Sequence, residues 1–530
     1  MGFFRRGLAL SAFLLHLIPF AHGYGQSVKA TGNTVSFQVN LTWEDSQPAG
    51  ISRKMILSNG QFPAPALNLK QGDDVEFLIL TLAVPGIEQH NTPWSDGHAH
   101  TRGQQEDGLY GAIHILPDEA LEKPFSLISD DQAELEAMEK AESKSTPIFL
   151  SDVRALTAEE LWEAEIAMGR DAVCANALLV NGKGSVTCLG QETLDQVTTT
   201  AMKGVLGNQS LTDIGCLPPT NSIAQGTFAQ NISAIPPTVF SGCVPSQGLT
   251  EHLYANATQT YVSYDFISAA FVSSITYSID EHPMYVYAVD GEYIEPILVG
   301  AITITNGARY SVLVKLDKPA GGYTIRLANS GVNQVLQGTA LMTYKNGGEP
   351  QQQPSEPSID LVGALTSPNY TLLNESLVVP LQAHNVAHVP VAQTRAGREN
   401  LTIATQNGTW VDIIFDVTNP LQPPHPIHKH SNKFFVTGQG ESNSAIPESF
   451  NFGTPQIRDS YATLPAATGP TWLAIRYHVV NPGAFLLHCH IQIHQSGGMA
   501  IALLNGIDEW PEIPEEYQLV EDKLERRFHH

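Results

Sequence analysis

The sequence has little positive charge. Its 28 Lys and Arg residues stand against 53 Asp and Glu residues, which gives a formal net charge of −25 over 530 residues. Nucleic acids and anionic membrane surfaces attract proteins through basic patches, so this balance argues against either as a partner. Charged residues make up only 15% of the chain, whereas 42% is hydrophobic. A chain of this length and composition predicts two to four domains with packed cores.

Long apolar runs are lacking after residue 20. Residues 7–20 are apolar, follow a basic start at Arg5 and Arg6, and precede small residues at 21–23. This pattern predicts a secretory signal peptide over residues 1–23, with an N-terminal anchor as the alternative. The rest of the chain carries N-x-S/T sequons typical of a secreted glycoprotein, at Asn40, Asn208, Asn231, Asn256, Asn369, Asn374, Asn400 and Asn407.

Cysteine is scarce, with five residues in the whole chain. Four of them are enough for two disulfides in an oxidising compartment, although their spacing leaves the pairing open: Cys174, Cys188, Cys216 and Cys243. The fifth, Cys489, stands apart in the middle of a group of histidines.

Short alternating runs broken by Gly, Asn, Asp and Pro dominate the sequence and predict an all-β fold of sandwich domains. The clearest runs are residues 35–43, 260–266, 284–294 and 310–316. Two segments are exceptions and predict helices. Residues 130–142 are rich in helix formers, and residues 157–169 open with a capping box from Thr157 to Glu160 and close on Gly169.

A segment rich in Gly, Pro and Gln, residues 346–358, predicts a linker. The part before it is large for one sandwich. We therefore expect three domains, at residues 24–145, 146–345 and 359–530.

The segment HCHIQIHQSGGM, residues 488–499, concentrates metal-binding side chains. Alternate residues of a strand share a face, so His488 and His490 should point one way and Cys489 the other. His494 and Met499 follow, where the chain can turn back toward Cys489. Two histidines, a cysteine and a weak axial methionine are the ligands of blue-copper electron-transfer sites. The segment therefore predicts contact with two metal sites at once.

Two other segments supply further ligands. In HPIHKH, His428 and His430 share one strand face, whereas the preceding His425 can aim toward Cys489. The segment HAH at 98–100 repeats the same spacing. Structural zinc also uses His and Cys but rarely needs three such pairs, so the set favours copper.

These segments, together with NGQFPAPALNLKQGDDVEF (59–77) and ARYSVLVKLDKPAGGYTIRLANSG (308–331), resemble the multicopper oxidases, the group of laccases, ascorbate oxidases and ferroxidases. The fungal laccase-like branch is the most similar. The resemblance implies three cupredoxin-like Greek-key β-sandwich domains that bind four copper ions. It also implies that single electrons leave a phenolic or related aromatic donor at the type 1 copper, pass through Cys489, and reduce O₂ to water at a three-copper cluster between domains 1 and 3.

The resemblance also implies the ligands. The type 1 copper would take His425, Cys489, His494 and the axial Met499; the type 2 copper would take His428; and the type 3 pair would take His98, His100, His430, His488 and His490. Asp96 resembles the acidic residue that assists proton delivery to the cluster, whereas Gln492 stands where several relatives carry a carboxylate.

The first domain departs from the family. The H-x-H-G motif, which supplies one type 2 and one type 3 ligand, is absent, and residues 83–85 (AVP) stand in its place. Gly97 runs directly into His98, where relatives have further strands. His90 and His114 are the other histidines of this region, and neither is at a family ligand position. We therefore expect an incomplete domain 1 that results either from coding sequence removed as false introns or from a degenerate protein.

Three functions fit these observations. The first is a secreted, extracellular or cell-wall laccase-like enzyme, monomeric and without a membrane span, that oxidises small aromatic compounds with O₂. The second is a ferroxidase, which would need acidic residues near the type 1 copper. The third is a blue-copper protein without enzymatic activity.

The flanking family sequence on both sides of each gap leads to a prediction about the transcript. The expressed messenger RNA should encode an H-x-H-G motif before Gly86 and additional residues between Gly97 and His98. Sequencing full-length cDNA across codons 77 to 100 tests this directly. A cDNA identical to the present sequence would show that the protein is a degenerate form.

Overall fold

The computed structural model describes residues 28–29, 34–71, 74–77, 103–118, 120–222, 229–345, 356–387, 391–392, 401–419, 422–442, 450–467 and 469–512. The chain divides into two units, of which the smaller comprises residues 1–38 and 72–78. The described part of this unit is one sheet in the order β1-β2-β6, formed by Val28–Lys29, Thr34–Phe37 and Asp74–Phe77. The predicted signal peptide and residues 346–355 of the predicted linker lie outside the described residues.

The larger unit contains a two-sheet sandwich built from residues 146–345. One sheet has the order β14-β13-β16-β11-β8-β9, and the other has the order β10-β18-β17-β12-β15. The strands are β8 Thr146–Val153, β9 Ala177–Val180, β10 His252–Asn256, β11 Tyr261–Ser268, β12 Ile275–Ile279, β13 Met284–Val289, β14 Glu292–Val299, β15 Ile302–Ile304, β16 Arg309–Lys315, β17 Gly322–Asn329 and β18 Gln337–Lys345. Alternate side chains of both sheets meet in one apolar core.

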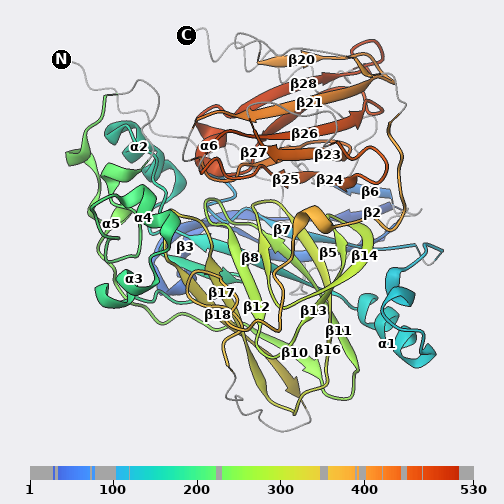
Figure 1. Ribbon diagram of the computed structural model, residues 1–530, viewed down its shortest axis with the longest axis horizontal. Helices are drawn as coiled ribbons and strands as arrows, with labels where there is room; N and C mark the ends of the chain where they lie inside the picture. Colours follow the sequence, from blue (N-terminus) through green and yellow to red (C-terminus); the bar gives the residue numbers. More distant parts are fainter. Residues whose placement is uncertain are drawn as a thin grey trace. The chain divides into compact units, whose positions relative to one another are not determined.

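A second sandwich in this unit is built from residues 391–505. Its sheets have the orders β19-β21-β26-β23-β24 and β20-β28-β27-β22-β25. The strands are β19 Val391–Ala392, β20 Thr402–Ala404, β21 Trp410–Val417, β22 Pro426–Lys429, β23 Phe434–Glu441, β24 Gln456–Arg458, β25 Ser460–Ala462, β26 Thr471–His478, β27 Gly483–Cys489 and β28 Ala500–Asn505. Figure 1 shows these strands in orange and red and those of the preceding sandwich mainly in green and yellow. This sandwich has its own core, which includes Phe434, Leu473 and Tyr477.

The strand predictions for residues 260–266, 284–294 and 310–316 are confirmed by β11, the β13–β14 hairpin and β16. The hairpin turns at Asp290 and Gly291, whose positive φ angles of 49° and 79° suit Asp and Gly. The prediction of one strand over residues 35–43 is wrong. The chain changes partner within it, since β2 pairs in parallel with β6, whereas β3 (Leu41–Ser46) pairs antiparallel with β4 (Arg53–Ser58).

Both predicted helices are present, as α1 (Gln132–Glu142) and α2 (Ala158–Met168). Helix α2 has the full capping box between Thr157 and Glu160 and ends at Gly169 in the left-handed conformation. Four short helices were not predicted: α3 Gln191–Val197, α4 Thr200–Leu206, α5 Pro237–Phe240 and α6 Gln492–Ser496. None of the described helices is long and apolar enough to cross a membrane.

In the larger unit, the predicted first domain has few described strands. Its described strands are the β3–β4 pair and a parallel pair of β5 (Ala64–Lys70) with β7 (Gly111–Leu116). Leu41 and Trp43 lie at alternate positions of β3, yet they are 46% and 43% exposed. In the part of the chain that the structure describes, no core cluster consists of residues of this domain alone; Ala49, for example, packs on Val153 and Leu179.

The four clustered cysteines form two disulfides, Cys174–Cys216 and Cys188–Cys243, and Cys489 is a buried free thiol. The first bridge closes a separation of 42 residues and is buried against α2. Removing a bridge of this kind typically costs about 2–5 kcal/mol.

The pairing leads to a prediction about thiols and stability. Denatured but unreduced protein should contain one titratable thiol, and replacing both Cys174 and Cys216 by Ala should lower the free energy of unfolding by about 2–5 kcal/mol, measured by denaturant titration. The Cys489→Ser variant serves as the control because it should have no thiol and both bridges. Two or more thiols in the unmodified protein would contradict the pairing.

Candidate metal centres

The antiparallel pairing of β22 with β27 brings the two histidine-rich segments together. In this pairing Ile427 lies opposite Cys489, and His428 lies opposite His488. Directly opposed residues of two strands share a face of the sheet, so His428 and His488 point to the same side. Cys489 points to the other side, as alternation predicted.

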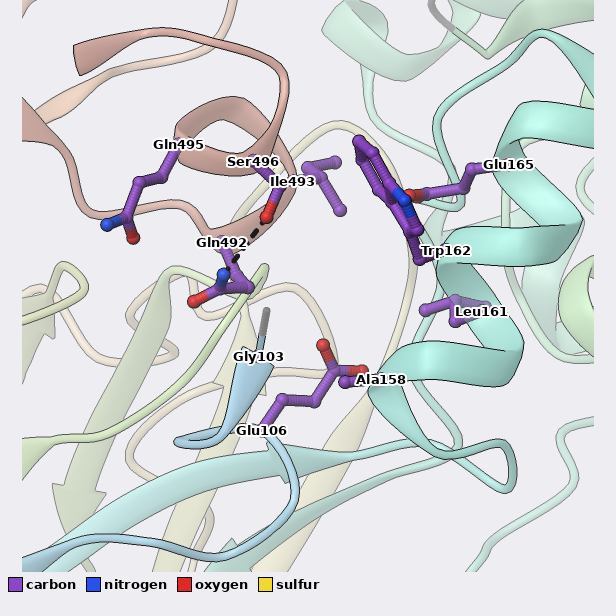
Figure 2. Close-up of a pocket in the computed structure, with 10 residues that line it drawn as sticks. All are labelled: Gly103, Glu106, Ala158, Leu161, Trp162, Glu165, Gln492, Ile493, Gln495 and Ser496. Atoms are coloured by element: carbon purple, nitrogen blue, oxygen red, sulfur yellow. Dashed lines mark hydrogen bonds between the residues drawn. The ribbon is translucent and has the colours of Figure 1, made fainter. Parts of the chain in front are cut away.

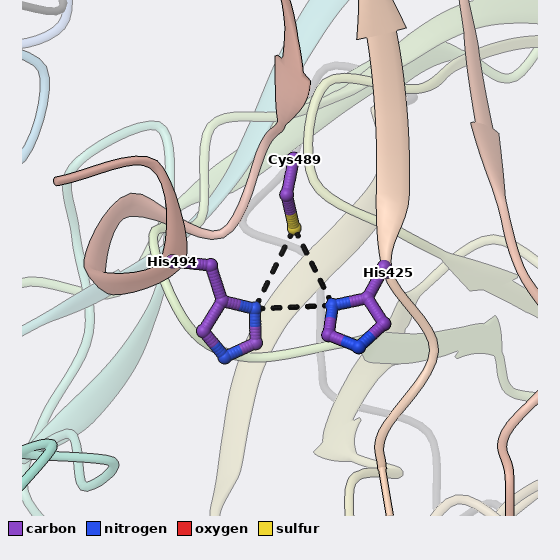
Figure 3. Close-up of side chains that lie close together, drawn as sticks. All are labelled: His425, Cys489 and His494. Atoms are coloured by element: carbon purple, nitrogen blue, oxygen red, sulfur yellow. Dashed lines mark hydrogen bonds between the residues drawn. The ribbon is translucent and has the colours of Figure 1, made fainter. Parts of the chain in front are cut away.

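Cys489, His425 and His494 form a triangle on the Cys489 side of the sheet (Figure 3). The distance between the two imidazole Nδ1 atoms is 3.2 Å, and the Cys489 Sγ lies 3.8 Å from Nδ1 of His425 and 3.5 Å from Nδ1 of His494. A metal ion about 2.0–2.3 Å from each ligand would hold such atoms about 3.5–3.8 Å apart in a trigonal plane. The three side chains therefore fit one metal ion.

Each corner of the triangle comes from a different element. Cys489 ends strand β27, and His494 lies in helix α6, whose N-cap residue Ile491 follows two residues after Cys489. His425 directly precedes β22, and it exchanges hydrogen bonds with Thr463, whose Oγ accepts the His425 N–H at 3.0 Å. The triangle is thus fixed by strand pairing and a helix start.

Burial keeps the two histidines of the triangle neutral. It lowers the pKa of His425 to about 4, and burial together with the neighbouring His425 lowers the pKa of His494 to about 3. Burial raises the pKa of the Cys489 thiol to about 12. The imidazoles therefore offer lone pairs at neutral pH, and a bound cation would supply the charge that removes the thiol proton.

A second group forms on the opposite face of the same strands. His428, His430 and His488 are buried, and one ligand nitrogen of each lies within 4.8 Å of the others. The Nε2 atoms of His430 and His488 are 3.2 Å apart. The ring of His490 lies 5.5 Å from that of His428 and 5.6 Å from that of His488, measured between centroids. The imidazoles of His428, His430 and His488 can therefore hold a metal ion, and His490 lies beside them.

Hydrogen bonds to main-chain carbonyls orient two of these rings. His428 Nδ1 donates to the carbonyl of Asp459 at 2.8 Å, and His488 Nδ1 donates to the carbonyl of Cys489 at 2.9 Å. Both bonds favour the tautomer that leaves the lone pair on Nε2. Burial also lowers the pKa of His490 to about 4. The sequence analysis did not identify Asp459 or Thr463, since no motif marks a residue that acts through its backbone or a loop hydroxyl.

The other predicted site residues are placed differently. Met499 accepts a backbone hydrogen bond from Cys489 and donates one to His494, but its side chain is 42% exposed. Asp96, His90, His98 and His100 lie outside the described residues. His114, on β7, lies 3.7 Å from a carboxylate oxygen of Asp265 and belongs to neither group.

A cavity of about 300 Å³ lies beside helix α6 (Figure 2). Gln492 lines it together with Trp162 and the buried carboxylates Glu106 and Glu165. Burial raises the pKa of Glu106 to about 6 and that of Glu165 to about 7, in each case against the attraction of Arg154. Both carboxylates can therefore take up and release protons near neutral pH. The amide side chain of Gln492, which lines the same cavity, cannot.

The triangle leads to a prediction about colour. Copper-loaded protein should be intensely blue, because a thiolate bonded to copper together with two imidazoles is the blue-copper arrangement. Cys489→Ser should abolish the blue absorption band, and His430→Ala, outside the triangle, should leave it. Persistence of the band in the Cys489→Ser protein would refute the assignment.

Comparison with known families finds matches in three parts of the chain. Three family models described as multicopper oxidase match residues 40–98, 144–347 and 373–509. The first match ends at His98, where the sequence analysis places the second gap.

Laccase abr2 of Aspergillus fumigatus is 40% identical over 577 aligned positions, which cover 92% of this chain and 97% of the relative. This chain has only 530 residues, so the relative contains residues that have no counterpart here.

Solved structures show the same fold. The laccase of Botrytis aclada superposes with a TM-score of 0.64 at 19% identity and covers 95% of this chain and 93% of its own. Fet3p, a multicopper oxidase that functions in iron import, superposes with a TM-score of 0.61 at 16% identity over 93% and 95% of the two chains. The fold is therefore that of three cupredoxin-like domains, and the protein belongs to the multicopper oxidase family as a copper-binding, fungal laccase-like oxidoreductase that uses oxygen.

Proposed function

We propose that this protein oxidises small phenolic or related aromatic compounds by single electrons and passes the electrons to O₂, with water as the product. One observation supports this most: the triangle of Cys489, His425 and His494 lies on one face of a strand pair, and the group of His428, His430 and His488 lies on the opposite face. Copper bound to such ligands supplies reversible one-electron oxidation and reduction.

The residues take distinct roles in this proposal. His425, Cys489, His494 and Met499 would hold the type 1 copper, and His428 would hold the type 2 copper. The type 3 ligands are His98, His100, His430, His488 and His490. Because Cys489 lies between His488 and His490 in the sequence, a short covalent path through the backbone joins the two groups.

The surroundings of Cys489 favour an aromatic donor over iron. The thiol packs in an apolar cluster with Val239, Phe240, Ile491 and Ile493. A blue-copper protein without enzymatic activity would not need the second group of histidines, which is costly to bury unless it serves a metal.

Asp96 and the protein's location complete the proposal. We assign Asp96 to proton delivery toward the cluster, because a carboxyl group can take up and release protons, whereas the amide of Gln492 cannot. The two disulfides and the predicted signal over residues 1–23 support secretion, to the medium or the cell wall. The net charge of −25 supports a protein that binds no nucleic acid, and we propose that it acts as a monomer.

The incomplete first domain leads to a prediction about the chain in its present form. Residues 24–530, loaded with copper and dialysed, should retain about one copper per chain and take up little oxygen with a phenol. The type 1 ligands all come from residues 425–499, whereas the cluster lacks the two histidines of the H-x-H-G motif. Losing even groups that orient a ligand costs about 10–100-fold in affinity or activity, and losing the ligands themselves should cost more.

Metal analysis, the blue absorption band and an oxygen electrode measure these outcomes. The matched control is Cys489→Ser, which should retain no blue copper. Four retained coppers with laccase-like turnover would show that another residue, such as His90, completes the cluster.

A further inference from the structure

The turn between β15 and β16, in the sandwich of residues 146–345, contacts the histidine group of the other sandwich. Gly307 in this turn faces the ring of His490 so closely that a Cβ atom would lie 2.7 Å from the ring Cδ2. Such a contact excludes any side chain at position 307. Arg309 begins β16 two residues later, and its Nη1 atom donates to the Gly307 carbonyl at 3.1 Å.

Arg309 forms a two-pronged ion pair with Asp459. Its Nη1 and Nη2 atoms donate to the two carboxylate oxygens of Asp459 at 2.5 and 2.6 Å. The Asp459 side chain is fully buried, and that of Arg309 is 21% exposed. Removing one partner of a buried pair leaves an uncompensated charge, so this contact holds Asp459 strongly in place.

The residue before Asp459 is held by the same sandwich. Arg458 Nε donates to Asp290 in the β13–β14 turn at 2.8 Å, and Asp290 also accepts the main-chain N–H of Arg309 at 2.9 Å. Two consecutive residues, Arg458 and Asp459, are thus fixed by charged groups of the neighbouring sandwich. The backbone between β24 and β25 has little freedom to move.

This backbone in turn fixes a predicted copper ligand. The main-chain carbonyl of Asp459 accepts Nδ1–H of His428 at 2.8 Å and the N–H of Lys429 at 3.0 Å. A displacement of Asp459 would therefore turn the His428 ring or change its tautomer. The direction of the His428 Nε2 lone pair therefore depends on contacts that begin at Arg309 in the neighbouring sandwich.

We propose that Arg309 is a positioning residue for the second metal group: through Asp459 it sets the ring orientation of His428 and makes metal binding there depend on the docking of the two sandwiches. This inference rests on the proposed function only in that His428 binds copper. The sandwich of residues 146–345 then helps to set the geometry of a metal site to which it contributes no ligand.

The test is an equilibrium copper titration of the metal-free protein without dialysis, so that weakly bound copper is also counted. The blue absorption band reports on the Cys489 group, and electron paramagnetic resonance reports on non-blue copper. Asp459→Asn should lower the affinity for non-blue copper about 10–100-fold, as expected when a group that orients a ligand is lost. The blue band should be unchanged, because none of its ligands contacts Asp459.

The control is Asp280→Asn. Asp280 is also fully buried, and it binds Arg326, whose Nε lies 2.9 Å from each of its oxygens. It is not within either metal group. Both substitutions should lower the thermal unfolding midpoint, but Asp280→Asn should leave both kinds of copper binding unchanged.

A double variant separates positioning from an unpaired charge. Arg309→Gln combined with Asp459→Asn removes both charges, so stability should recover in part while non-blue affinity stays low. The proposal would be overturned if Asp459→Asn left the affinity for non-blue copper unchanged, or if the double variant recovered that affinity. It would also be overturned if Asp280→Asn lost as much affinity as Asp459→Asn, or if the unmodified chain bound no non-blue copper. Failure of the proposed function itself would appear separately, as the absence of a blue band in the unmodified chain.

Discussion

The pairing of β22 with β27 is the contact on which both metal groups depend. Its register sets His428 opposite His488 and Ile427 opposite Cys489, so that one strand pair presents imidazoles on one face and a thiol on the other. A shift by one residue would send every ligand to the wrong face. The pairing is enclosed by β25 and β28 within a five-stranded sheet, which holds this register in the interior of the sandwich.

Burial gives these side chains their chemistry. Burial lowers the pKa values of His425, His488, His490 and His494, so these imidazoles remain neutral. Neutral imidazoles repel one another little and bind cations well. The same burial keeps Cys489 a thiol until a cation arrives. Burying five or more such groups without metal is unfavourable, and this cost is what makes the sites bind metal tightly.

The sandwiches are not independent supports. Charged side chains of residues 290–309 hold Arg458 and Asp459, and through them the His428 ring. The first domain is different, because residues such as Ala49 and Ala112 pack on the sandwich of residues 146–345, whereas Leu41 and Trp43 are exposed. A cluster that needs ligands from this domain is therefore supported from one side only in the present chain.

The sequence alone determined the family, the all-β fold, the two long helices and the candidate ligands, because these depend on local patterns. Alternation in H-C-H separates the thiol from its flanking histidines whatever the surrounding fold, and the capping box of α2 needs only neighbouring residues. The tertiary structure decided the disulfide pairing, the break between β2 and β3, and the part played by Asp459 and Arg309. Each of these joins residues far apart in the chain, such as Cys174 with Cys216, and their meeting depends on how whole sheets pack, which no local pattern encodes.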